Sequence, residues 1–467
     1  MLPSTPYAAL GLAISLCLAG CVSPFDLPTT GPIPTAWKNA GDFPTAQPDR
    51  DLQRWWRAFD DATLAKVIRA GLDSSPDVAS ATARVREARA NRKATASALL
   101  PTLSYSGDTS AGISDTDGAP RSTSQSYSAG LSASWEADLF GRNRSNIAAA
   151  SASLGAAEEN LNNVRAALAA EIAAAYTGLR ANEARLEILQ RNIKLQTETY
   201  QIADWRRQAG EADALESGQA ETSLIQSKAA IPSLQQSISQ GRNLLARLCG
   251  REPGGLSALL SGAPVIPDPA GRLAVGIPAD TLRQRPDVRA AGYNLLASVA
   301  RTRAAEAERF PSLSLSGSLG INSLSSAKLY NPESISAGII AGLAGPIFDA
   351  GRISANIEAS DAQTEQALQA YRSTVLLALS EVEDSLIACR RSAERLAALE
   401  KATRLARETD MLARQRYEAG EIDFLSVLDS QRTLLGLEDS LISSHADRTT
   451  AYIRLYEALG GGWSPRA

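Results

Sequence analysis

Residues 101–107 read PTLSYSG, and residues 311–317, 210 positions further along the chain, read PSLSLSG. The same offset relates four further matches: Pro76-Asp77-Val78 with Pro286-Asp287-Val288, Gly141-Arg142 with Gly351-Arg352, Ala209-Gly210-Glu211 with Ala419-Gly420-Glu421, and Gly250 with Gly460. A constant offset indicates two copies of one supersecondary unit. The sequence therefore predicts two tandem repeats, at 51–250 and 276–460, joined by a Pro- and Gly-rich equatorial linker over 251–275 and followed by a tail over 461–467.

Polar and apolar residues alternate through the quoted stretches and beyond them. Between Ser312 and Asn322 the even positions are Ser, Gly or Asn, and the odd positions are Leu, Ile or Gly. A period of two predicts strands, which we expect at about 102–114, 126–136, 312–322 and 334–344. Such runs with an aromatic residue near an end, such as Trp135, are typical of transmembrane barrels. A half-buried soluble sheet gives the same alternation in one strand, but four such strands favour the barrel.

Four strands are too few to close a barrel within one chain. In lipid, an open edge would leave backbone groups without hydrogen-bond partners, at a cost of several kcal/mol each. We therefore expect the barrel to be shared among subunits. Two chains would give eight strands and an interior filled by side chains, whereas three would give twelve and a channel. The small Ser and Gly residues of the polar face favour twelve.

The segments between the strands predict very long helices. Residues 353–419 contain neither Gly nor Pro, and a helix over 353–418 would be on the order of 100 Å long. Its apolar residues step by four and three, which predicts coiled-coil-like packing: Val375, Leu379, Val382, Leu386, Cys389, Ala393 and Leu396. Each repeat should then read helix, strand, strand, long helix, tight turn, helix. The alternative is the long helices of a cytosolic scaffold, which the N-terminal residues disfavour.

An apolar run over residues 8–18 is too short to span a bilayer and is followed by Leu18-Ala19-Gly20-Cys21. This resembles a bacterial lipoprotein signal, in which residues 1–20 are removed and Cys21 is lipidated. The alternative is an ordinary signal peptide with an incidental cysteine. Acyl chains on Cys21 would tether the protein to a membrane, and Val22, by resemblance to sorted lipoproteins, favours the outer membrane. The Pro-rich residues 21–50 should form an extended segment along the body.

Composition excludes several classes of function. Lys and Arg number 47 against 51 Asp and Glu, and no basic run is present, which argues against nucleic acid as a partner. The only histidine is His445, which we expect at the surface, and Cys249 and Cys389 are expected to be buried apolar side chains. No group of residues predicts a metal site, a cofactor site or a catalytic constellation. We therefore expect a protein that is not an enzyme.

Several motifs together match one family of proteins: Trp55-Trp56-Arg57-x-Phe59-x-Asp61, the two Pro-Asp-Val sites, and Arg416-Tyr417-Glu418-Ala419-Gly420 running to Leu428-Asp429-Ser430-Gln431-Arg432. With these motifs the chain resembles the outer-membrane efflux proteins (TolC-like outer-membrane factors), in particular their NodT-type lipoprotein branch. The resemblance implies an α+β membrane protein that forms a homotrimer. Its twelve-stranded outer-membrane β-barrel would continue into a long periplasmic α-helical barrel, with a lipid anchor in the outer membrane.

The resemblance also implies a function. The trimer would be the outer-membrane channel of a tripartite efflux system and would passively conduct small molecules, such as drugs, to the exterior. Its partners would be a periplasmic adaptor (membrane fusion) protein and an inner-membrane pump of the RND type. One alternative is the exit duct of a polypeptide secretion system, and another, of a different class, is a structural envelope lipoprotein.

Two turns match the hairpin tips that meet the adaptor in this family. By resemblance, Gly210 and Glu211 lie at one tip, and Gly420 and Glu421 lie at the other. Glycine tolerates the positive φ that often ends a helix. The alternative interpretation is that these are turn glycines only.

Five positions match those that close the periplasmic aperture in the family. Asp429 matches an acidic ring that would attract cations, with a solvated helix-face charge as the alternative. Glu216 and Tyr417 match a hydrogen-bonded pair that ties neighbouring helices shut. The chain departs from the pattern at Ser426, where some members have a second acidic residue, and at Ile422, where an arginine latch is found. We therefore expect the closure to be weaker or differently built, and opening to be an iris-like untwisting of helices.

Overall fold

The computed structural model describes residues 33–41, 43, 50–115, 117–118, 121–269 and 278–463. The predicted signal peptide and Cys21 lie outside these residues. The chain divides into two compact units. We call the one that includes 84–157 and 290–372 the strand unit, and the one that includes 30–83, 158–289 and 373–467 the helical unit.

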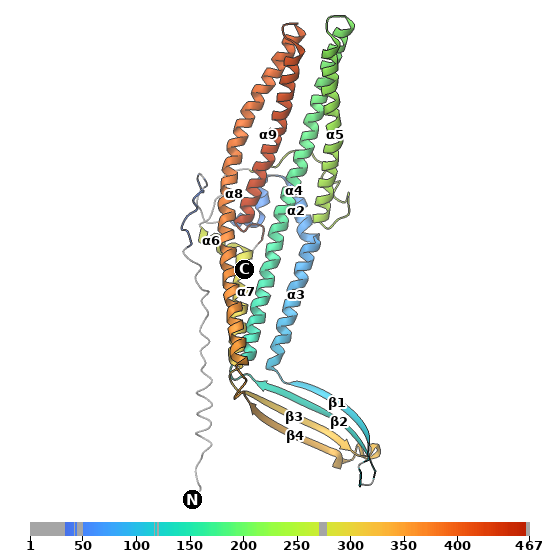
Figure 1. Ribbon diagram of the computed structural model, residues 1–467, viewed down its shortest axis with the longest axis vertical. Helices are drawn as coiled ribbons and strands as arrows, with labels where there is room; N and C mark the ends of the chain where they lie inside the picture. The colour runs from blue at the N-terminus through green and yellow to red at the C-terminus, as the bar shows by residue number, and fades with distance from the viewer. Residues whose placement is uncertain are drawn as a thin grey trace. The chain divides into compact units, whose positions relative to one another are not determined.

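The strand unit contains one antiparallel sheet with the strand order β1-β2-β3-β4 (Figure 1). Its strands are β1 (Thr102–Ser114), β2 (Ser122–Ala137), β3 (Ser312–Ser323) and β4 (Ile335–Ala344). The prediction that the second strand begins at about residue 126 was wrong. Ser122 already pairs with Ser114, because the alternation of small polar residues continues back to this position and keeps the ladder in register.

The register places like side chains opposite one another. Tyr105 on β1 pairs with Leu131 on β2, and Leu131 pairs with Leu319 on β3. Likewise Ser132 pairs with Ser104 on one side and with Ser318 on the other. Because alternate residues point to opposite faces, the sheet has an apolar face, which includes the first set, and a hydroxyl face, which includes the second. One exception is Ile340, which lies on the hydroxyl face because it pairs with Ser316.

Both repeats show the same order of helices around their strands. The first has α2 (Ala62–Ser74), α3 (Pro76–Ala96), α4 (Arg142–Gln208) and α5 (Ala214–Leu248). The second has α6 (Pro278–Gln284), α7 (Pro286–Ala307), α8 (Arg352–Glu418) and α9 (Phe424–Ala458). Helices α4 and α8 have 67 residues each, and α5 and α9 have 35 each. The predicted tandem repeat, with its long helices and tight turns, is confirmed.

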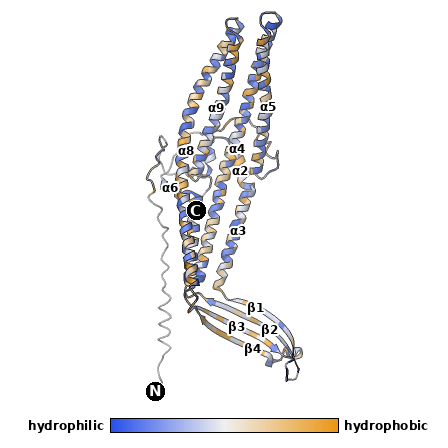
Figure 2. Cartoon of the chain, viewed as in Figure 1, coloured by the Kyte–Doolittle hydropathy of each residue, from blue (hydrophilic) through white to orange (hydrophobic). Residues whose placement is uncertain are grey.

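The long helices carry hydrophilic and hydrophobic residues along their whole length (Figure 2). The apolar seam of α8 is confirmed over most of its course, since Val375, Val382, Leu386, Cys389 and Leu396 are buried. Ala393 is exposed, so the seam is interrupted there. Among the described residues, no helix combines the length and the apolar character needed to cross a membrane.

The Trp-Trp motif forms the core of the helical unit. Short 3₁₀ turns over Arg50–Phe59 (η1) place Trp55, which is 2% exposed, in a stack on Tyr456 of α9 with ring centroids 5.3 Å apart. Asp61 caps α2 by accepting hydrogen bonds from the backbone N–H groups of Thr63 and Leu64, at 2.8 and 2.9 Å. The motif is therefore explained by packing and capping, and Cys249 and Cys389 are buried free thiols, as predicted.

A short part of the N-terminal segment lies against α8. Trp37, which is 8% exposed, packs against Val382 and Leu386. The carboxylate of Glu383 accepts hydrogen bonds from the backbone N–H of Lys38 at 2.7 Å, the backbone N–H of Asn39 at 3.1 Å and the side-chain amide of Asn39 at 2.6 Å. An apolar anchor and a carboxylate therefore hold this segment on the helical unit.

Candidate functional site at the hairpin tips

Two helical hairpins turn at the same end of the helical unit (Figure 1). Gly210, between α4 and α5, has φ = +77°, and Gly420, between α8 and α9, has φ = +75°. In each turn the residue after the glycine donates its N–H to a carbonyl five residues earlier: Glu211 to Arg206 at 2.8 Å and Glu421 to Arg416 at 2.9 Å. This is the Schellman ending of a helix, which needs a residue in the left-handed region. Glu211 and Glu421 are exposed at the two tips.

We expect Gly210→Ala and Gly420→Ala each to lower the free energy of unfolding by about 1–2 kcal/mol, because alanine is strained at positive φ. A Cβ at either glycine would meet no heavy atom within 4 Å, so no steric clash adds to this cost. Gly218→Ala is the matched control, since Gly218 lies inside α5 with equally open surroundings. There alanine should stabilise by about 1 kcal/mol. Thermal unfolding of the three variants tests this, and equal effects would mean that the turns do not require glycine.

An aspartate caps the helix that follows each turn. Asp213 accepts the N–H of Glu216 at 3.0 Å, and Asp423 accepts the N–H of Ser426 at 3.1 Å. Asp423 also accepts the hydroxyl of Ser426 at 2.6 Å. The Ser426 hydroxyl and then its N–H lower the pKa of the Asp423 carboxyl. The hydroxyl of Ser426 thus completes a helix cap.

A cluster beside the turns joins all four long helices, and we call its members Arg206, Glu216, Tyr417 and Phe424 the tip cluster. Tyr417 of α8 is 3% exposed and donates its hydroxyl to the carboxylate of Glu216 on α5. The guanidinium of Arg206 on α4 lies 4.9 Å from the centre of the Tyr417 ring, and Phe424 of α9 packs edge-on against that ring at 5.7 Å. Burial, together with the Glu216 carboxylate, raises the pKa of Tyr417 to about 12. Tyr417 is therefore a neutral hydrogen-bond donor at neutral pH.

The other residues expected at the aperture take different positions. Asp429 is exposed on α9, less than two turns beyond the first residue of that helix, Phe424. Ile422 is half-buried and packs on the apolar residues beside Tyr417. The structure thus brings Glu216 and Tyr417 together, places Ile422 against them, and leaves Asp429 and Ser426 exposed.

Two members of the tip cluster have no signal in the sequence that identifies them. Arg206 contacts Tyr417 from α4, a helix of the other repeat, whereas Phe424 contacts it from the first residue of α9, seven positions further along the chain. An arginine in a long polar helix looks like any solvated charge. Phe424 directly follows the capping residue Asp423 at the start of α9, and no sequence pattern indicates its contact with Tyr417.

Polar ties also link the hairpins away from the tips. The carboxylate of Glu438 on α9 accepts hydrogen bonds from Arg407 of α8 at 2.8 and 3.0 Å and from Asn192 of α4 at 3.2 Å. Nearer the tips, Gln431 of α9 donates to the hydroxyl of Thr199 on α4 at 3.2 Å. The buried members are Glu438, Gln431 and Thr199, so each of their partners satisfies a polar atom that water does not reach. These ties fix how the two hairpins lie against each other.

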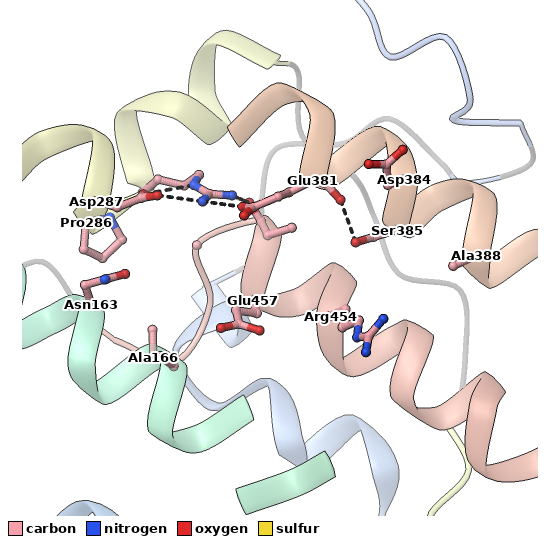
Figure 3. Close-up of a pocket in the computed structure, with 14 residues that line it drawn as sticks. Asn163, Ala166, Pro286, Asp287, Glu381, Asp384, Ser385, Ala388, Arg454 and Glu457 are labelled. Carbon is pink, nitrogen blue, oxygen red and sulfur yellow. Dashed lines mark hydrogen bonds and ion pairs between the residues drawn. The ribbon is translucent and has the colours of Figure 1, made fainter. Parts of the chain in front are cut away.

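The helical unit also contains a charged cavity of about 510 Å³ (Figure 3). Arg285 binds Asp287 at 2.7 Å and Glu381 at 2.6 Å, and donates to the carbonyl of Ala458 at 3.0 Å. Glu457 and Arg454 extend toward the cavity from α9 (Figure 3). Burial, and then the nearby Glu381 carboxylate, raises the pKa of Glu457, which Arg285 and Arg454 partly oppose. The charged side chains that line the cavity mainly pair with one another. We therefore interpret the cavity as a structural feature of the helical unit.

Glu457→Gln is expected to raise the midpoint of thermal unfolding at about pH 7. A carboxyl whose pKa is raised in the folded state stabilises the fold below its ordinary pKa, and this contribution is lost as the pH rises through the raised value. Ionised Glu457 therefore opposes folding at about pH 7. At about pH 4 the Glu457 carboxyl is largely neutral, like the glutamine side chain, so the difference in unfolding midpoint between wild type and variant should vanish. Unfolding at both pH values tests this, and an equal shift at each would point to packing instead.

Among the described residues, no three His, Cys, Asp or Glu side chains gather in a way that could hold a metal ion. His445 is half-buried within α9. The main features of the described residues are two long helical hairpins and a four-stranded sheet with one apolar and one hydroxyl face. These are the features of a membrane channel.

The chain belongs to the outer membrane efflux protein family, whose model matches residues 67–251 and 277–461, one match in each repeat. It is similar to the pyoverdine export outer membrane protein OpmQ of Pseudomonas putida, with 31% identity over 97% of both chains. Nodulation protein T of Rhizobium leguminosarum bv. trifolii is 31% identical over 97% of both chains, and the toluene efflux pump outer membrane protein TtgI of Pseudomonas putida is 31% identical over 87% of both.

Among solved structures, the outer-membrane channel OprN is similar with a TM-score of 0.88 and 31% identity, over 95% of this chain and all of that one. The resemblance inferred from the motifs is thus confirmed. The protein is an outer-membrane efflux protein, a transport component and not an enzyme.

Proposed function

We propose that three copies of this chain form one conduit, the outer-membrane channel of a tripartite efflux system. One observation carries the proposal: the sheet has two open edges and two faces of opposite polarity. In the described chain β1 pairs only with β2, and β4 pairs only with β3. Within lipid such edges must find partners, and pairing β4 of one copy with β1 of the next satisfies both. Three copies close a twelve-stranded barrel wide enough for a channel.

The polarity of the two faces supports this arrangement. Leu103, Tyr105 and Ile113 on the apolar face are 72%, 87% and 65% exposed in a single chain. An exposed apolar surface of this kind needs a cover, and lipid provides it when the sheet is curved into a barrel. The hydroxyl face then lines a water-filled lumen. The long hairpins of the three copies would continue the conduit as a periplasmic α-helical barrel.

We also propose that the chain is anchored by lipid at Cys21. The sequence Leu18-Ala19-Gly20-Cys21 supports this, and the contacts of Trp37 and Glu383 would hold the segment that leads to the anchor. Cys21→Ser should abolish labelling by radioactive palmitate while the protein is still exported. Retained labelling would contradict the assignment of Cys21. Membrane fractionation of the same variant shows whether the barrel alone retains the protein in the outer membrane.

The partners would be a periplasmic adaptor at the hairpin tips and an inner-membrane pump, which we propose to be of the RND type. The exposed tips at Gly210, Glu211, Gly420 and Glu421 offer two similar surfaces in each chain, related by the internal repeat. An adaptor with repeated hairpins could therefore make matched contacts around a trimer. Conduction would be passive, and the pump would supply the energy.

The periplasmic aperture would be closed by the tip cluster together with Asp429. In a trimer, Asp429 from three chains would form a ring of carboxylates near the threefold axis, which attracts cations. Ser426, whose hydroxyl donates to the capping residue Asp423, would not add a second charge. The hydrogen bond from Tyr417 to Glu216 would hold the helices in the closed arrangement, and adaptor binding would favour its release.

Deletion of the gene tests the function as a whole. Raised accumulation of dyes and antibiotics, reversed by complementation and with unchanged secreted proteins, would support small-molecule efflux. The toluene efflux relative favours this outcome. Loss of a secreted protein with normal accumulation would favour a polypeptide exit duct instead. A structural envelope lipoprotein would leave both unchanged, and purified protein would then show no conductance in planar bilayers.

A further inference from the structure

The hydroxyl face of the sheet is almost free of charge. Asp108 and Glu136 are the only charged residues within the four strands. Both lie on this face, because Asp108 pairs with Ser128 and Glu136 pairs with Ser314. Glu136, near the end of β2, forms an ion pair with Arg142 at 2.7 Å. Asp108 is different, since it is exposed at the middle of the 13-residue strand β1.

The residues around Asp108 form a neutral ladder of hydroxyls. The Ser104 hydroxyl bonds that of Ser132 at 2.8 Å, and the Ser110 hydroxyl bonds that of Ser126 at 2.8 Å. These side chains satisfy one another across the two strands and contribute no net charge. Asp108 stands between the two pairs, so its carboxylate dominates the electrostatic potential on this part of the face.

We infer that Asp108 gives the strand-lined part of the conduit a preference for cations. The inference rests on the proposed trimeric channel, in which the hydroxyl face surrounds the lumen. There, three copies of Asp108 form a ring of carboxylates at one level of the barrel. A ring of fixed negative charge raises the local concentration of cations and lowers that of anions. Compounds that carry a positive charge are thus favoured at a level of the conduit distinct from the proposed aperture at Asp429.

The size of the effect follows from screening. Charges that line a water-filled lumen act over a Debye length of about 10 Å at 0.1 M salt and about 30 Å at 0.01 M. The ring therefore selects weakly at high salt and more strongly at low salt. At about 0.1 M salt we expect removal of three unit charges to change the ratio of K⁺ to Cl⁻ permeability about two-fold.

The row that contains Asp108 provides a charge-conserving control. Asp108 pairs with Ser128, and Ser128 pairs with Asn322 on β3, so the three residues lie in one row across the sheet. Asn322 has nearly the shape of aspartate but no charge. The double variant Asp108→Asn with Asn322→Asp therefore moves the charge two strands along the same row. It keeps the number of charges and leaves the composition of the strands unchanged.

The test is the reversal potential of single channels in a planar bilayer under a KCl gradient, for the full-length trimer. Wild type, Asp108→Asn, Asn322→Asp and the double variant are compared, each with and without Asp429→Ser so that the aperture does not mask the barrel. We expect K⁺ preference to fall about two-fold in Asp108→Asn, to rise in Asn322→Asp and to return to the wild-type value in the double variant.

Two outcomes would overturn the inference. One is an unchanged permeability ratio in Asp108→Asn channels that conduct normally. The other is a double variant that stays as unselective as Asp108→Asn, which would mean that the first substitution acted through strand structure and not through charge. A wild-type protein that forms no channels would contradict the proposed function itself and the inference with it. Larger differences at low salt than at high salt would support an electrostatic origin.

Discussion

Replacing Arg180 by alanine is expected to lower the free energy of unfolding by about 3–5 kcal/mol, the cost of breaking a buried ion pair. The side chain of Arg180 on α4 is 1% exposed and binds the carboxylate of Glu183 at 2.7 Å. The same nitrogen, Nη1, donates to the carbonyls of Leu260 and Gly262, at 3.2 and 3.3 Å, in the linker between the repeats. Its guanidinium also lies 4.9 Å from the centre of the Tyr176 ring. Alanine would leave these partners without their common donor.

Arg242→Ala is the matched control for this prediction. Arg242 binds the same carboxylate, that of Glu183, at 2.8 Å, but its side chain is 48% exposed. An exposed ion pair contributes only about 0–1 kcal/mol. Thermal unfolding of the purified protein should therefore separate the two variants clearly, and proteolysis of the linker should increase only in Arg180→Ala. Equal effects would mean that burial of the guanidinium does not determine the loss.

Most of the fold could be predicted from the sequence because the patterns that indicate it are local and repeated. Alternation near Leu313 and Leu315 required a strand, and the absence of Gly and Pro from 353–419 required a long helix. The constant offset of 210 then indicated that both copies have the same order of helices and strands. Errors occurred where a residue fits two interpretations. Ser122 suits a loop or a strand, and Ala393 suits a buried seam or an exposed helix face.

The contacts of the candidate site could not be predicted from sequence patterns to the same extent. Tyr417 and Glu216 are 201 positions apart, and no period or spacing joins them, so their pairing came only from resemblance to a family. Arg180, Glu183 and the linker carbonyls form another example. Their contacts depend on how α4 packs against a segment about 80 residues away. Contacts between distant segments follow from tertiary packing, which local patterns do not encode.

Tyr417→Phe is expected to open the proposed aperture. The change removes the hydroxyl that donates to Glu216 but keeps the ring that packs on Phe424 and Arg206. A hydrogen bond to a charged group contributes about 1.5–3 kcal/mol. If that bond exists only in the closed arrangement, its loss shifts the equilibrium toward the open one by about ten- to a hundred-fold in each chain. Higher conductance in planar bilayers and greater entry of large antibiotics into cells would report this shift.

Two variants and a pH series make this prediction specific. Tyr200→Phe removes a hydroxyl from a residue that packs on the same apolar cluster, so conductance should stay at the wild-type value. Glu216→Gln keeps an oxygen acceptor for Tyr417 and should open the aperture less than Tyr417→Phe. The folded-state pKa of Tyr417 is raised to about 12, above the ordinary value of about 10. The contribution of Tyr417 to the free energy of unfolding is therefore fully present below about pH 10 and is lost as the pH rises toward 12.

Because the chain departs from the family pattern at Ile422 and Ser426, we expect Tyr417→Phe to raise conductance strongly. Where the resemblance implies an arginine latch, this chain has Ile422, whose side chain packs on the apolar cluster and cannot donate a hydrogen bond. The hydroxyl of Ser426 donates to the carboxylate of Asp423, the residue that caps α9. Because these two positions contribute no polar ties across the proposed aperture, the bond from Tyr417 to Glu216 should supply a greater share of the closing free energy. Tyr417→Phe channels that conduct no more than Tyr200→Phe channels would contradict this role and assign closure to the apolar packing around Phe424.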